Sequence, residues 1–208
     1  MAEFGILVLA AGKSSRFGSD KLMATMADNQ PMIAHSLEPL LILAKQFQLE
    51  LCVITRADNQ PLINYLTTAG INYSLCPDAH LGMGHSIAYG IKSHQNWQGW
   101  MIALADMPNI NLELLTSLLE TIQCNPDAII RPAFTRDGKI KPAHPVYFPQ
   151  QYGFQLNQLT GDKGAREIIK QQKLVTQLDG GIIAELILMD MDTPESLKSH
   201  HIKNRHEK

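Results

Sequence analysis

A small-residue segment with two cations follows the first apolar run of the chain. It reads LAAGKSSRFGSDK, residues 9–21, directly after the apolar run at 4–10, and we call it the phosphate loop. Small residues let backbone N–H groups approach phosphate oxygens closely, and Arg16 and Lys21 add two full positive charges. This combination favours binding of a polyphosphate. The candidate residues are Leu9, Ala10, Ala11, Gly12, Ser14, Ser15, Arg16 and Lys21.

The phosphate loop is neither of the two common glycine-rich nucleotide motifs. The Walker spacing G-x-x-x-x-G-K-[ST] is absent, and so is the dinucleotide fingerprint G-x-G-x-x-G. A tight strand-to-helix turn with two surface cations is the alternative interpretation. Small residues, arginine and lysine together favour the phosphate site, because ligands of open α/β sheets bind at the carboxyl ends of the strands.

Two aspartates lie at the ends of apolar runs. Asp106 follows MIALA at 101–105, and Asp192 lies in LILMDMDTPESL at 186–197. A carboxylate at the end of a buried strand is costly unless a charge compensates it, and Mg²⁺ held by carboxylates and phosphate oxygens supplies that charge. We therefore expect Mg²⁺ as the cofactor, held by Asp106 and Asp192. Helix capping stays open for Asp192, because Thr193-Pro194-Glu195 is typical of a helix start.

The composition of the whole chain excludes several classes of protein. The chain has 208 residues, 45% of them hydrophobic, with a formal net charge of −2 and a pI of about 6.4. These values fit one α/β domain and give no basic face for nucleic acid. No apolar run reaches the roughly 18 residues of a membrane span. No basic region precedes the first apolar run, so we expect a cytoplasmic protein without a signal peptide.

Apolar runs of strand type alternate with segments of helical period. We expect strands and helices in turn, with strands at 4–10, 50–56, 71–75 and 99–105 and helices over 31–47, 58–68, 86–95 and 112–123. Pro39 predicts a kink or a break in the first helix, and Asp58 and Asn111 are the expected N-caps. The alternation predicts an α/β fold with a mainly parallel sheet and helices on both faces.

The second half of the chain departs from this alternation. The segments 128–134 and 144–148, around the Asp137-Gly138 turn, predict a small β-hairpin insertion. A helix near 162–172 and further strands and a helix up to 197 follow: strands at 174–178 and 186–190 and a last helix from Pro194. We expect one domain over 1–197 and a polar C-terminal tail over 198–208.

Six motifs occur in an order that resembles a known family. They read LAAGKSSRFGSDK, LGMGHSIAYGI, ALADMP, KPAHPVYF, LTGDKGAREII and MDMDTPESL. Together they resemble the molybdenum cofactor cytidylyltransferase family, within the MobA-like NTP transferase superfamily, over nearly the whole chain. The first motif is shared by many nucleotidyltransferases, whereas KPxHP and GDxGAR are more specific to this branch. The resemblance implies a Rossmann-like nucleotidyltransferase fold.

The resemblance also assigns residues to two sides of one site. It implies that the phosphate loop holds the phosphates of CTP and that Asp106, with Asp192, holds Mg²⁺. The other residues expected near the nucleotide are Asp78, Gly82, Gly84, His85 and Ser86. The residues expected on the pterin side are His144, Pro145, Asp162 and Lys163.

Structural alternatives stay open for several of these residues. The LGMGHS glycines could form a plain turn, and His85 could start a helix without touching a ligand. His144 could simply be exposed, and Asp162 could be the N-cap of the helix after it. The family usually reads KPGHP, so Ala143 replaces a glycine here. If that position needs a positive φ, Ala143 strains the loop on the pterin side.

The activity that the resemblance implies is transfer of CMP from CTP to the terminal phosphate of molybdenum-carrying molybdopterin, with release of pyrophosphate. The expected partners are therefore CTP, a molybdopterin-type substrate and a recipient molybdoenzyme. The nucleophile is already an anion, so no general base is needed. Arg16, Lys21 and Asp106 are the expected catalytic residues, because the reaction requires charge neutralisation and positioning.

Three other functions remain open at this point. A methylerythritol-phosphate cytidylyltransferase shares the first motif, but it usually carries an arginine in the loop equivalent to 84–86, where this chain has none. A molybdopterin guanylyltransferase usually reads LAGG where this chain reads LAAG. A cofactor-binding chaperone would keep the fold without turnover, but binding alone would not need Arg16, Lys21 and Asp106 together.

Overall fold

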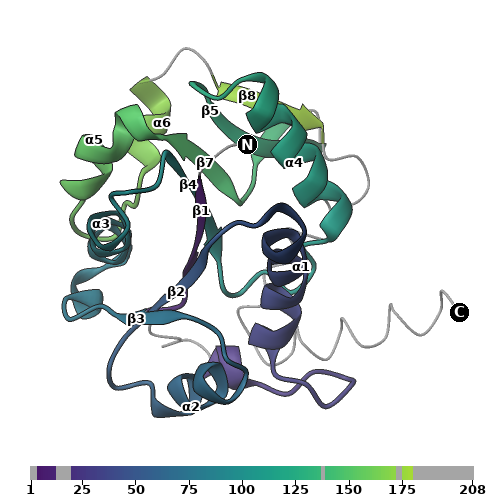
Figure 1. Cartoon of the computed structure of the whole chain (residues 1–208), viewed down its shortest axis with the longest axis vertical. Helices are drawn as coiled ribbons and strands as arrows, with labels where there is room; N and C mark the ends of the chain where they lie inside the picture. Colours follow the sequence, from purple (N-terminus) through teal and green to yellow (C-terminus); the bar gives the residue numbers. More distant parts are fainter. Residues whose placement is uncertain (1–3, 13–19, 137–138, 172–174, 180–208) are drawn as a thin grey trace, which may run out of the picture.

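One mixed sheet runs through the computed structural model, which describes residues 4–12, 20–136, 139–171 and 175–179. Within these ranges the strand order is β3-β2-β1-β4-β7-β5-β6, and β8 pairs with β5 (Figure 1). The strands are β1 (Gly5–Leu9), β2 (Leu51–Thr55), β3 (Tyr73–Leu75), β4 (Gly99–Leu104), β5 (Ile129–Arg136), β6 (Lys139–Pro142), β7 (Val146–Pro149) and β8 (Val175–Asp179).

The first half of the chain builds the parallel part of this sheet. β1 pairs in parallel with both β2 and β4, and β3 pairs in parallel with β2. The carboxyl ends of these four strands therefore lie along one edge. The expected mainly parallel α/β fold is confirmed.

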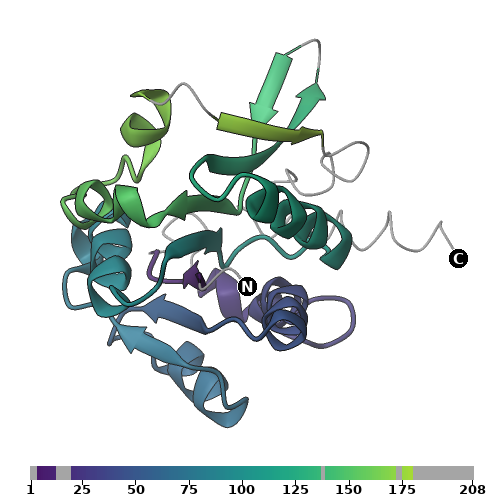
Figure 2. The same ribbon diagram turned by 45° about the horizontal axis from the view of Figure 1, so that its top comes forward.

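The second half adds the antiparallel strands. The expected hairpin forms with a different second arm: β5 pairs with β6 at 139–142, and these two strands extend away from the rest of the sheet, whereas the expected arm at 144–148 contributes to β7 (Figure 2). β7 lies inside the main sheet, antiparallel to both β4 and β5. Because β7 reverses direction between them, β5 runs parallel to β4. The segment that leads into β7 therefore starts beside the carboxyl end of β4.

Helices cover both faces of the sheet. One face carries α1 (Met32–Phe47) and α4 (Leu112–Cys124), and the other carries α3 (Met83–Ser93), α5 (Gly153–Asn157) and α6 (Arg166–Gln171) (Figure 1). Alternation along β1 explains this arrangement: Ile6 and Val8 belong to the apolar cluster under α1 and α4, and Leu7 and Leu9 to the cluster under α3. A strand that is apolar on both faces needs cover on both.

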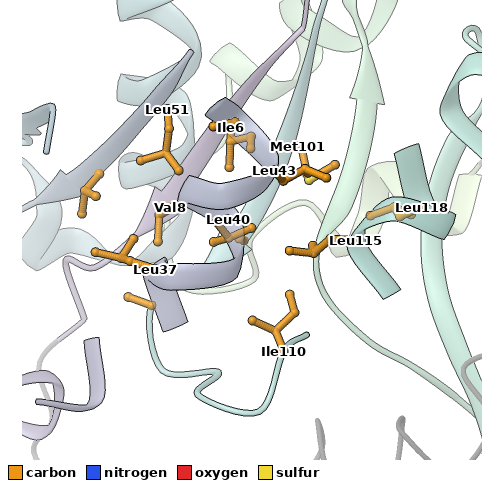
Figure 3. Packing of buried hydrophobic residues seen from close by; sticks show 14 of the residues in the cluster. Ile6, Val8, Leu37, Leu40, Leu43, Leu51, Met101, Ile110, Leu115 and Leu118 are labelled. Carbon is orange, nitrogen blue, oxygen red and sulfur yellow. The ribbon is translucent and has the colours of Figure 1, made fainter. Parts of the chain in front are cut away.

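The first cluster shows how the helices attach. Figure 3 shows leucines of α1 and α4 meeting the sheet side chains Ile6, Val8 and Met101. The shorter helix α2 (Gln60–Thr68) adds Leu62 and Leu66 to the same cluster. These contacts hold in place the strands whose carboxyl ends carry the candidate site.

Two expected helix features differ in the structure. α1 runs without interruption through Pro39, so the expected break there is wrong. The N-cap of α2 is Asn59 and not Asp58, because the Asn59 side chain accepts a hydrogen bond from the backbone N–H of Leu62 at 3.2 Å. The Asn111 cap of α4 is confirmed by a 3.0 Å bond from the N–H of Leu114.

The expected elements beyond residue 179 lie outside the described residues. These are the strand at 186–190, the helix from Pro194 and the tail at 198–208. Among the described helices, none has the length and apolar character needed to cross a membrane.

Leu40→Ala should destabilise the protein far more than Ile42→Ala on the same helix. Leu40 is 1% exposed within the first cluster, whereas Ile42 is 44% exposed. We expect a loss of about 2–5 kcal/mol for Leu40→Ala and about 0.5 kcal/mol or less for Ile42→Ala, measured by urea unfolding. Equal losses would mean that α1 does not pack through Leu40.

Candidate functional site

A buried lysine and an aspartate meet at the carboxyl edge of β1 and β4. The N–H of Ala105 donates to the carbonyl of Leu9 at 3.1 Å, which carries the pairing of the two strands to their ends. Asp106 follows directly. Lys21 starts a short 3-10 helix, η1 (Lys21–Met23), whose N-cap Asp20 accepts from the N–H of Leu22. Lys21 Nζ lies 3.0 Å from Asp106 Oδ2.

The two partners of this ion pair differ in exposure. The Lys21 side chain is 8% exposed, and that of Asp106 is 40% exposed. A nearly buried ammonium is stable only when an anion is held against it. Asp106 compensates Lys21 and still presents an open side to a ligand.

The open side of Asp106 fits a divalent cation only in part. In the described ranges, no group of three or more His, Cys, Asp or Glu side chains is placed to hold a metal ion. A Mg²⁺ ion commonly takes one or two protein carboxylates and fills its remaining positions with phosphate oxygens and water. Asp106 can therefore supply one ligand, and the bound nucleotide would have to supply others.

Arg56 connects the phosphate loop to the neighbouring strand, and sequence reasoning missed it. Arg56 follows β2, and its Nη1 donates to the carbonyl of Gly12 at 3.3 Å. Its Nε lies 2.8 Å from Asp58 Oδ1, as an ion pair without hydrogen-bond geometry. The available signal was its position, because a cation directly after a buried parallel strand reaches the same edge as Asp106.

Residues 9–12 of the phosphate loop present backbone, not side chains. Its first residues are buried: Leu9, Ala10 and Ala11. Gly12 is exposed, and among the described residues a Cβ built on it meets nothing within 4 Å. Four of the expected site residues lie outside the described residues: Ser14, Ser15, Arg16 and Asp192.

The first turn of α3 and the turn before α6 touch each other. The N–H of Gly84 donates to the carbonyl of Gly161 at 2.7 Å, and the N–H of Gly161 donates to His85 Nδ1 at 3.2 Å. Ser86 is buried, whereas Asp78, Asp162 and Lys163 are exposed. The structure thus joins a segment expected on the nucleotide side to one expected on the pterin side. Gly84 and His85 lie in the first turn of α3, as the helix-start alternative for His85 expects, and a role of either residue at a nucleotide stays a prediction.

His144 is enclosed beside Asp106, so the simple exposed alternative is wrong. Its Nδ1 lies 3.5 Å from the carbonyl of Ile102 in β4. Burial lowers the pKa of His144, while the Ile102 carbonyl and the negative charge of Asp106 oppose that shift and the positive charge of Arg131 adds to it. The imidazole is therefore influenced by both a carboxylate and a guanidinium.

Arg131 is a second residue that sequence reasoning missed. It lies in β5 on the face of Ile129, which is the face covered by α3, α5 and α6. Its Nε is buried and has no hydrogen-bond partner in the part of the chain that the structure describes. Burial also lowers the pKa of Arg131. The signal in the sequence was a charged residue within the apolar run AIIRPAF.

Two expectations for the pterin side are corrected. Among the described residues, the non-glycine residues with positive φ are Asn29 and Gln48, so Ala143 is not strained. Its N–H donates to the carbonyl of Pro132 at 2.9 Å, in an ordinary strand contact. Asp162 is not the N-cap of α6, because that helix begins four residues later, at Arg166.

The chain matches a family model described as the MobA-like NTP transferase domain over residues 6–176. It is also similar to the purine catabolism protein PucB of Bacillus subtilis (strain 168). That relative is 28% identical over 200 residues, which cover 90% of each chain.

Solved structures show the same fold at low sequence identity. Rv0371c from Mycobacterium tuberculosis H37Rv has a TM-score of 0.75 and 19% identity, covering 95% of this chain and 97% of its own. Its complex with manganese has a TM-score of 0.71, with the same identity and coverage. A CMP:2-keto-3-deoxy-manno-octonic acid synthetase complexed with CTP has a TM-score of 0.73 and 14% identity, covering 99% and 100%. The sheet and helices are therefore those of Rossmann-like nucleotidyltransferases.

Arg131→Met should stabilise the protein. The substitution keeps the length of the aliphatic stem and removes a half-buried cation whose Nε has no acceptor. We expect the free energy of unfolding to rise by about 1 kcal/mol, because a buried charge without a good partner costs folding energy. Lys45→Met on α1, where Lys45 is exposed, should change it by about 0.5 kcal/mol or less. A clear loss of stability in Arg131→Met would show that the guanidinium has a structural partner.

Proposed function

This chain belongs to the family of MobA-like NTP transferase domains, and from that premise we propose that it transfers CMP from CTP to the terminal phosphate of molybdenum-carrying molybdopterin. The nucleotidyltransferase class follows from the family. The cytidylyl donor, the molybdopterin acceptor and a cytoplasmic role that serves a recipient molybdoenzyme are the proposed part.

The observation that carries the proposal is the Lys21–Asp106 pair beside Gly12. Lys21 Nζ and Asp106 Oδ2 are 3.0 Å apart at the strand edge where the phosphate loop begins. These groups lie at one edge of the sheet and can together bind and orient a triphosphate. They are the Lys21 ammonium, the half-exposed Asp106 carboxylate and the exposed backbone of Gly12. A chaperone that only held a cofactor would not need this set.

The chemistry proposed at this edge is an in-line displacement. An oxygen of the acceptor phosphate forms a bond to the α-phosphorus of CTP, and the bond from that phosphorus to the bridging oxygen breaks. The bridging oxygen keeps the electron pair and leaves as part of pyrophosphate. The attacking oxygen is already anionic, so no side chain has to remove a proton. The protein has to bring two anions together and stabilise the charge.

The chain's own residues divide this task between them. Lys21 and, in the phosphate loop, Arg16 would stabilise negative charge on the departing phosphates. Asp106, with Asp192 as the expected second ligand, would hold Mg²⁺, which supplies Lewis-acid stabilisation of the phosphate oxygens when bound. The similar Rv0371c structure with manganese supports a divalent cation in this fold.

Arg131 and His144 extend the site away from the nucleotide. In the strand order, β1 lies on one side of β4, and β7 and β5 lie on the other. β1 and β5 are three strand spacings apart, which is roughly 14 Å at about 4.8 Å per step. A half-buried guanidinium at that distance suits an anionic group of the acceptor, with His144 and Pro145 as its proposed neighbours and the exposed Asp162 and Lys163 as further proposed acceptor residues.

CTP is the proposed donor because the chain reads LAAG at the start of the phosphate loop. Ala11 is buried in the cluster under α3, so its methyl group narrows the space at the point where the loop leaves β1. One methyl group in a tight pocket is worth about 1–3 kcal/mol, which gives partial discrimination against a purine. The similar synthetase structure that is complexed with CTP is compatible with this choice.

The protein, incubated with Mg²⁺, labelled CTP or GTP and molybdenum-loaded molybdopterin, should form a cytosine dinucleotide and pyrophosphate. We expect kcat/KM for CTP to exceed that for GTP by about tenfold to a hundredfold. Asp106→Asn should lower the rate about a thousandfold or more. The matched control is Asp127→Asn, because Asp127 is exposed just before β5, at the opposite edge of the sheet.

Each alternative function gives a different result in this assay. Equal use of GTP would assign a guanylyl or promiscuous enzyme. Transfer to methylerythritol phosphate in place of molybdopterin would assign the other cytidylyltransferase class. Tight binding of molybdopterin without pyrophosphate release from any nucleotide would assign a chaperone.

A further inference from the structure

Two loops from distant parts of the chain form one backbone-to-backbone contact. The first, residues 82–85, runs from the N-cap Gly82 through the first three residues of α3, and the second, residues 160–164, leads into α6. The carbonyl of Gly161 accepts from the N–H of Gly84 at 2.7 Å, and the N–H of Gly161 donates to His85 Nδ1 at 3.2 Å. Both the carbonyl and the N–H of Gly161 are thus hydrogen-bonded to the first segment.

The glycines of the first loop make this contact possible. Gly82 has φ +121°, and a Cβ on it would lie 2.4 Å from Asp162 Oδ1 and 2.5 Å from the carbonyl carbon of Gly161. A Cβ on Gly84 would lie 2.6 Å from the carbonyl oxygen of Thr160. These distances are below contact, so the two backbones approach only because both positions lack a side chain.

The hydrogen bond to His85 defines the state of its imidazole. A backbone N–H donates, so Nδ1 has to be an unprotonated acceptor and the ring proton of the neutral form lies on Nε2. His85 is half-buried, and its own carbonyl lies 3.9 Å from Cys76 Sγ as a weak acceptor. The backbone of His85 therefore contacts the chain leaving β3, while its ring contacts the turn before α6.

The two loops belong to different halves of the proposed site. Gly84 and Ser86 belong to the nucleotide half, and Asp162 and Lys163 to the acceptor half. Resting on the proposed function, we infer that the bond from Gly161 to His85 couples these halves, so that nucleotide binding orders the acceptor loop. His85 is then a positioning residue for the acceptor and touches neither reacting phosphate. Coupling of this kind is reciprocal, so acceptor binding strengthens nucleotide binding by the same factor.

Two amide substitutions of His85 test the hydrogen bond itself. The side-chain oxygen of asparagine can occupy the place of Nδ1, whereas the amide of glutamine reaches the place of Nε2. His85→Asn should keep the coupling, and His85→Gln should lose it, although both are small polar changes. His80→Gln is the matched control, because His80 is exposed on the short helix η2 (Ala79–Leu81), five residues before His85.

Amide hydrogen exchange gives a measurement that does not depend on turnover. Mg²⁺ and CTP should slow exchange of the segment 160–164 in the wild type, in His85→Asn and in His80→Gln, but not in His85→Gln. In the transfer assay, His85→Gln should raise the KM for molybdopterin and, at saturating molybdopterin, the KM for CTP about tenfold each, because the coupling is reciprocal, while kcat and the affinity for CTP without acceptor stay within about twofold.

The outcomes separate this inference from the proposed function. If CTP binds, as followed by calorimetry, and exchange at 160–164 does not respond in the wild type, the coupling is refuted while the function stands. Equal behaviour of His85→Asn and His85→Gln also refutes the hydrogen bond as its cause. If exchange responds as expected but molybdopterin is not a substrate, the coupling stands and the proposed acceptor is wrong.

Discussion

The rest of the site depends on the ion pair between Lys21 and Asp106. Lys21 as a whole residue is only 6% exposed. A lysine buried to this extent destabilises a folded protein unless an anion is fixed against its ammonium. The sheet supplies that anion because β1 and β4 are parallel neighbours in register, so the phosphate loop and Asp106 leave the sheet at the same edge. Any change in that register would separate a buried cation from its counter-charge and also dismantle the phosphate site.

The acceptor half is held by a different kind of constraint. Antiparallel β7 starts beside the end of β4, which places His144 against Ile102 and within the field of Asp106. β5 then adds Arg131, a guanidinium that is half-buried and has an unpartnered Nε within the described residues. Burying the guanidinium in this way lowers the free energy of unfolding, and a negatively charged ligand bound to it would offset that loss. The glycines at the start of α3 join the turn before α6 to the proposed nucleotide half through a close backbone contact that a side chain at either glycine would prevent.

The order and type of the main elements were predictable from the sequence, because β1, β2 and β4 are apolar on both faces and the segments between them have helical period. The position of Asp106 at a strand end was predictable for the same reason. Arg56, Arg131 and the bond from Gly161 to His85 were not, because each depends on which strands or loops become neighbours. The sequence places Gly161 76 residues from His85, and no local pattern links them. Asn59 replaces Asp58 as a cap because the two side chains compete locally and Asp58 pairs with Arg56.

The affinity of CTP, measured by calorimetry with Mg²⁺ and with a chelator, tests most directly whether Asp106 and Lys21 form a metal-assisted triphosphate site. In the wild type, Mg²⁺ should tighten CTP binding by about tenfold or more, because Asp106 would hold the cation and the cation would offset the charge of the phosphates. In Asp106→Asn this gain from Mg²⁺ should disappear, while Lys21→Met should weaken CTP binding with and without the metal. An undiminished gain from Mg²⁺ in Asp106→Asn would contradict the account, because the metal would then be held elsewhere.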